Sequence, residues 1–135
     1  MRTSSLKLLG ICLLLLAAVS GIRASQARAL EVAIDISPNV LNLESQGTVV
    51  TVHTDLDYEQ VDAYSVYLND VAISSWKADN RGDFVAKFSM EEVKSLDGLV
   101  IDEYNTLQIA GVTTDGEAFA GAQDILVIDK IPRGQ

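Results

Sequence analysis

The sequence predicts an all-β domain, a β-sandwich of about seven to nine short strands with one short helix. Apolar residues alternate with polar ones in short runs along residues 30–135, which is typical of half-buried strands. Turn-forming residues separate these runs about every 8–12 residues, a spacing typical of a sandwich. A small barrel is the alternative arrangement of the same strands.

Residues 30–36 give the clearest strand, because every second side chain is aliphatic. A polar, acidic loop is predicted at residues 55–62, and the final apolar run suits a central strand. The predicted strands after the first are residues 41–44, 48–54, 64–68, 71–76, 84–88, 106–109 and 125–128.

One helix is predicted to begin near Ser89. Ser89 and Glu92 have the spacing of a capping box, and apolar residues then follow at helical intervals until Asp97-Gly98. Tight turns are predicted at Asp79-Asn80-Arg81-Gly82 and at Thr114-Asp115-Gly116, where the Asp-Gly pair favours a hairpin.

The first 29 residues predict a cleaved signal peptide. Two basic residues precede an apolar run at residues 8–19, and small residues at the end place the cleavage after Ala27 or Ala29. Arg23 interrupts the run before it reaches the roughly 20 residues that a membrane-spanning helix needs. We therefore expect residues 30–135 to form one domain, secreted or periplasmic, with no membrane span after cleavage.

The mature chain is strongly acidic. All 19 acidic residues follow residue 29, but only six of the ten basic residues do, so the net charge falls from −9 to −13. This charge argues against nucleic acid as a partner, because phosphate binding needs clustered lysine and arginine. The one cysteine, Cys12, lies in the predicted signal, so the mature domain has no disulfide.

Several phrases, taken in order, resemble a module of bacterial exported and surface proteins. The opening is Val32-Ala33-Ile34-Asp35-Ile36 with Pro38, and the closing phrase, Gly111 to Gly121, reads G-x-T-x-D-G-x-x-F-x-G; between them lie Pro38-Asn39, Asn42-Leu43, Asp55-Leu56-Asp57, Val61-Asp62 and Ser65-Val66. The resemblance covers nearly the whole mature chain and implies an immunoglobulin-like sandwich without catalysis. This chain departs from the family in a shortened first turn and a shortened middle loop.

Two acidic segments of the chain are candidates for a calcium site. The family's middle loop looks like a calcium loop, but here Asp79-Asn80-Arg81-Gly82-Asp83 offers few oxygens and includes an arginine. A better cluster is Asp55, Asp57, Glu59 and Asp62, because one loop can bring three of these four side chains together. An acidic surface loop is the simpler interpretation of these four residues. Calcium is therefore an alternative, and no other cofactor is expected.

A tripeptide, the histidine and the aromatic residues also suggest binding sites, but each has a simpler interpretation. Arg81-Gly82-Asp83 spells a tripeptide that integrins recognise, although the same residues suit a turn. His53 is the only histidine, and we expect it on a sheet surface. The aromatic residues would form a carbohydrate-stacking surface or, more simply, pack in the core and on the strands; they are Tyr58, Tyr64, Tyr67, Trp76 and Tyr104.

The sequence favours an exported, non-catalytic module with a binding or structural role, whose partner is a protein or another component of the envelope or exterior. One alternative is a calcium-responsive binding module that uses residues 55–62. Another is a small secreted hydrolase, against which the lack of a second histidine argues.

Overall fold

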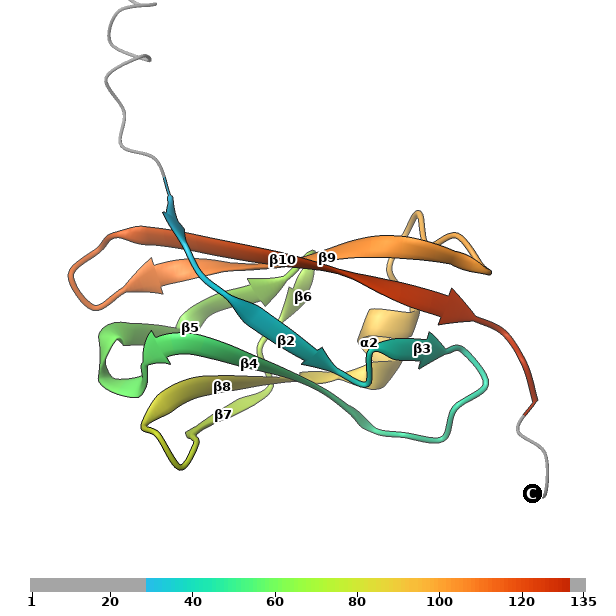
Figure 1. The fold of residues 1–135 in the computed structure, drawn as a ribbon, viewed down its shortest axis with the longest axis horizontal. Coiled ribbons are helices and arrows are strands. Elements are labelled where there is room, and N and C mark those ends of the chain that lie inside the picture. The colour runs from blue at the N-terminus through green and yellow to red at the C-terminus, as the bar shows by residue number, and fades with distance from the viewer. Residues whose placement is uncertain (1–28, 132–135) are drawn as a thin grey trace, which may run out of the picture.

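The computed structural model describes residues 29–131, which form ten strands, one α-helix and one 3-10 helix (Figure 1). The predicted signal peptide lies outside the described residues except for Ala29. The elements are β1 (Leu30–Glu31), β2 (Ile34–Ser37), β3 (Val40–Asn42), β4 (Val49–Asp57), η1 (Tyr58–Gln60), β5 (Val61–Leu68), β6 (Val71–Ala72), β7 (Ser75–Ala78), β8 (Asp83–Ser89), α2 (Met90–Lys94), β9 (Glu103–Thr113) and β10 (Ala118–Ile128).

The strands form two sheets with the hydrophobic core between them. Sheet A has the order β1-β10-β9-β5-β6, with β3 also paired to β10, and sheet B has the order β2-β4-β8-β7. Pairing is antiparallel except that β1 and β3 run parallel to β10. The all-β prediction is confirmed, and the final apolar run lies in β10, a central strand as expected.

Alternation along the strands builds the core. In β4 the buried residues are every second one from Val50 to Leu56, and the residues between them point outward. Phe84 and Phe88 in β8 and Phe119 in β10 are the largest fully buried side chains. The predicted helix is confirmed as α2, with the Ser89 hydroxyl accepting a hydrogen bond from the Glu92 N–H at 3.4 Å.

The first predicted strand, residues 30–36, is wrong as a single element. It breaks at Val32-Ala33, where the chain crosses from β10 in sheet A to β4 in sheet B. The Val32 N–H donates to the Ala120 carbonyl at 2.9 Å, and the Asp55 N–H donates to the Ala33 carbonyl at 3.2 Å. The two residues of the crossing are thus bonded to opposite sheets, and the backbone stays hydrogen-bonded throughout.

The predicted strand at residues 71–76 also divides between the sheets. Residues 71–72 are β6 of sheet A, and β7 of sheet B begins at Ser75. The Ile73 N–H donates to Val66 of sheet A at 3.1 Å, whereas Ser74 bonds the Lys87 carbonyl of sheet B through its N–H at 2.8 Å and its hydroxyl at 2.9 Å. Both divisions raise the number of strands above the predicted seven to nine.

The predicted acidic loop at residues 55–62 is largely regular structure. Strand β4 continues to Asp57, the single turn η1 covers residues 58–60, and β5 begins at Val61. The Asp57 carboxylate accepts the Glu59 N–H at 3.0 Å and so caps η1. The turn is therefore much shorter than the loop that the sequence predicts.

Candidate functional site

The four predicted metal ligands are divided between the two sheets. Asp55 and Asp57 lie on the outer face of β4 in sheet B, Glu59 is in η1, and Asp62 is in β5 of sheet A opposite Val112. The Asp55 carboxylate accepts the Ala33 N–H at 3.1 Å. Within residues 29–131, no three histidine, cysteine or acidic side chains lie together in a way that could hold a metal ion.

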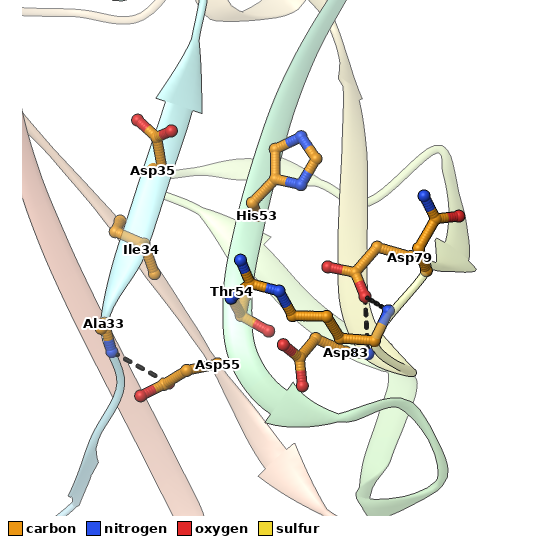
Figure 2. Close-up of a pocket in the computed structure, with 10 residues that line it drawn as sticks. Ala33, Ile34, Asp35, His53, Thr54, Asp55, Asp79 and Asp83 are labelled. Carbon is orange, nitrogen blue, oxygen red and sulfur yellow. Dashed lines mark hydrogen bonds between the residues drawn. The ribbon is translucent and has the colours of Figure 1, made fainter.

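The hollow in Figure 2 lies on the outer face of sheet B between β2, β4 and the β7–β8 turn. It brings Asp55, one of the predicted ligands, together with His53 and with residues of the turn predicted at Asp79-Asn80-Arg81-Gly82. Its charged and titratable lining is Asp35, His53, Asp55, Asp79, Arg81 and Asp83. The mixture of carboxylates with a guanidinium would attract small cations or basic side chains only weakly.

Asp79 stabilises the β7–β8 turn. Its Oδ1 accepts the N–H of Asp83 at 3.0 Å and that of Arg81 at 2.8 Å, both drawn in Figure 2. The bond from Asp83, then that from Arg81, lowers the pKa of the Asp79 carboxyl below its ordinary value of 3.8. The predicted turn is confirmed, and Gly82, with φ of 85°, occupies a left-handed position in it.

His53 lies on the surface of sheet B, as expected. It is exposed, with Asp35 of β2 opposite on one side and Val85 of β8 on the other. The hydroxyl in the lining belongs to Thr54, which donates to the Phe84 carbonyl at 2.7 Å and accepts the Leu56 N–H at 3.2 Å. That hydroxyl therefore has a structural role and is not presented to a substrate.

The aromatic residues do not form one platform. Tyr64 of β5 and Trp76 of β7 meet edge to face with ring centroids 5.0 Å apart, which links the two sheets. Tyr58 packs at 6.3 Å against the buried Phe84, whereas Tyr104 lies on β9, away from these pairs in sequence and 72 % exposed. The five aromatic residues considered for a carbohydrate-stacking surface are thus dispersed over four elements, η1, β5, β7 and β9.

Sequence reasoning missed the outer face of sheet A. In β9 the buried side chains of Leu107 and Ile109 point toward the core, so the residues on either side of each point outward. In β10 the side chains of Ile125 and Val127 are buried, and the residues next to them in the strand likewise point outward. We call this surface the β9–β10 face; its residues are Tyr104, Thr106, Gln108, Ala110, Val112, Ala118, Ala120, Ala122, Asp124, Leu126 and Ile128.

The eleven residues that define the β9–β10 face include one acidic side chain, and two more acidic side chains lie on the strands beside it. Asp124 is its only ionisable residue besides the phenol of Tyr104, and its Oδ1 accepts the Thr106 hydroxyl at 2.6 Å. The same side of sheet A continues onto the neighbouring strands, where Tyr67 of β5 opposes Ala110 and Val40 of β3 opposes Leu126. Two exposed acidic residues lie there as well, Glu31 of β1 opposite Ala120 and Asp62 of β5 opposite Val112. Tyr67 is 47 % exposed and Val40 is 40 % exposed. In Figure 1 no strand or helix of the described residues covers this side of β9 and β10.

Comparison of the chain with protein-family models, curated proteins and solved structures found no match. The family resemblance in the sequence therefore stays a prediction. Among residues 29–131, no helix has the length and hydrophobicity to cross a membrane.

Proposed function

We propose that this chain is an exported, non-catalytic module with an immunoglobulin-like sandwich, secreted or periplasmic, that binds a protein or another component outside the cytoplasm. The signal-peptide pattern of residues 1–29 supports export. Two packed, mainly antiparallel sheets in a domain of about 100 residues support the immunoglobulin-like assignment.

The observation that carries the binding role is the β9–β10 face. Nineteen acidic residues make the mature chain −13, yet only one of them lies among the eleven outward positions of β9 and β10. The remaining positions are mostly alanine, aliphatic or tyrosine. Interfaces are typically depleted of charge at their centre, and the outward positions of β9 and β10 share this feature, with Glu31 and Asp62 on the strands beside them.

Site-specific photo-crosslinking in the native host tests this proposal. A photoreactive amino acid replaces Ala110, at the centre of the face, or Ser75, an exposed residue on the outer face of sheet B, as the matched control. We expect higher-mass adducts from position 110 and few from position 75, on a protein whose N-terminus mass spectrometry places at Arg28 or Leu30. Equal adduct yields from the two positions would remove the binding role from this face, and an intact Met1 would remove export.

A further inference from the structure

The β7–β8 turn presents the tripeptide Arg81-Gly82-Asp83, whose three backbone N–H groups are already hydrogen-bonded within the chain. Those of Arg81 and Asp83 donate to Asp79 Oδ1 at 2.8 Å and 3.0 Å (Figure 2), and that of Gly82 donates to the Asp79 carbonyl at 3.0 Å. The Gly82 carbonyl accepts the Tyr58 N–H at 2.9 Å, which ties the turn to η1. The tripeptide is therefore held in one conformation before a partner arrives, which lowers the entropy cost of binding.

The geometry of the turn accounts for Asp79 and Gly82 but not for the two charged side chains of the tripeptide. Asp79 accepts the N–H bonds, and Gly82 has a φ of 85°, which favours glycine. The bonds that hold the turn use backbone groups of Arg81 and Asp83, so neither the guanidinium nor the carboxylate is needed to form it.

The tripeptide is also accessible. Arg81 and Gly82 are exposed, and Asp83 is half-buried at the start of β8. A Cβ placed on Gly82 would meet no atom within 4 Å, so a partner can approach the backbone between the two charged residues. One glycine therefore separates a cationic and an anionic side chain on a rigid, open turn.

We propose that the β7–β8 turn is a second binding site, for a receptor that holds a divalent cation beside an acidic groove, as integrins do. A guanidinium forms paired, charge-assisted hydrogen bonds with carboxylates, which fits Arg81 to the acidic groove. A carboxylate is a preferred ligand of magnesium and calcium ions, which fits Asp83 to the cation. The turn lies on sheet B, so this site does not depend on the β9–β10 face of sheet A.

Binding of a purified integrin ectodomain that recognises Arg-Gly-Asp peptides tests the proposal. The mature chain, purified from an exporting host, is immobilised, and the ectodomain is passed over it in manganese chloride and again in EDTA. We expect saturable binding that EDTA abolishes, because the Asp83 carboxylate binds through the cation of the receptor. A soluble linear Arg-Gly-Asp peptide should displace the ectodomain, whereas the same peptide with glutamate in place of aspartate should not.

Two substitutions test the side chains while Asp79 and Gly82 keep the turn. Asp83→Glu retains the charge but moves the carboxylate by one methylene, and it should weaken binding at least about 100-fold. Arg81→Gln removes the guanidinium and should weaken binding at least about 10-fold. Lys77→Gln, the matched control, removes a positive charge from an exposed position of β7 and should leave binding unchanged. Circular dichroism and the melting temperature establish that the three variants fold.

The proposal is overturned if the native chain shows no saturable binding, or if binding persists in EDTA or in Asp83→Glu. An equal loss in Lys77→Gln and Arg81→Gln would also overturn it, because net charge and not the tripeptide would then be recognised. Binding that the soluble peptide does not displace would have the same meaning, and that measurement needs no variant to fold. None of these outcomes bears on crosslinking at Ala110, which tests the other sheet.

Discussion

Replacing Gly121 with alanine should strongly destabilise the domain, because the crossing between β1 and β2 leaves no room for a side chain. A Cβ at position 121 would overlap the Val32 carbonyl oxygen and lie 3.0 Å from Cγ2 of Ile34. The first of these atoms belongs to the backbone of the crossing, which the hydrogen bond from Val32 to Ala120 ties to β10. Relief of the clash therefore requires a shift of β1 away from sheet A.

The expected magnitude follows from the cost of overpacking. Forcing one extra carbon into a well-packed site costs about 1–3 kcal/mol, and the upper part of that range applies here because backbone has to move. In a domain of about 100 residues, 1 kcal/mol corresponds to a shift of about 4–8 °C. We expect Gly121→Ala to lower the melting temperature by about 8–20 °C.

Thermal unfolding followed by circular dichroism measures this effect, with Gly47→Ala as the matched control. A Cβ at Gly47 would meet the flexible end of Met90 at 3.1 Å, and the residue is not in the left-handed region. That variant should change the melting temperature little, or raise it slightly through the lower entropy of the unfolded chain. If Gly121→Ala is as stable as Gly47→Ala, the crossing is not packed as described.

Three further predictions concern the cap, the turn and the acidic residues. Ser89→Ala removes the cap of α2 and should lower the free energy of unfolding by about 0.5–2 kcal/mol in urea titration; no change would show that the 3.4 Å contact does not stabilise the helix. Because the pKa of Asp79 is lower in the folded chain, its charged form stabilises the fold above pH 3.8, and this contribution fades as pH falls through the folded value. The melting-temperature difference between the native chain and Asp79→Asn should therefore be present near neutral pH and close in acid; a difference that widened in acid would contradict this sign. Calcium and sodium chloride at matched ionic strength should stabilise the domain equally, and Asp57→Asn should not abolish the gain; a calcium-specific gain lost in Asp57→Asn would favour the calcium-responsive alternative.

Local pattern was sufficient to locate strands but not to assign them to sheets. Val32 and Ile36 are both buried and lie four residues apart, so the period of two continues through the crossing at Ala33. The alternation of apolar and polar residues indicates which side of an extended segment faces the core, and here both sheets face the same core. The change of hydrogen-bonding partner therefore leaves no mark in the alternation, and residues 30–36 read as one strand.

The β9–β10 face escaped prediction for a different reason. Strands β9 and β10 are 11 residues long, but the sequence predicts only residues 106–109 and 125–128 as strands. The missed parts contain Ala110, Gly111, Ala120 and Gly121, and alanine and glycine are depleted in strands. These residues adopt the strand conformation because β9 and β10 pair with each other along almost their whole length. That pairing is a property of the sheet and not of the local sequence.

The proposed binding role requires the β9–β10 face to be covered where the protein works, and thiol labelling measures this coverage directly. Cys12 lies in the predicted signal, so single-cysteine variants of the mature chain at Ala110 and Ser75 each carry one thiol. The proposed binding role predicts that position 110 reacts much more slowly in the native host than in dilute purified protein, while position 75 reacts at the same rate in both. Equal rates for position 110 in the two settings would contradict it.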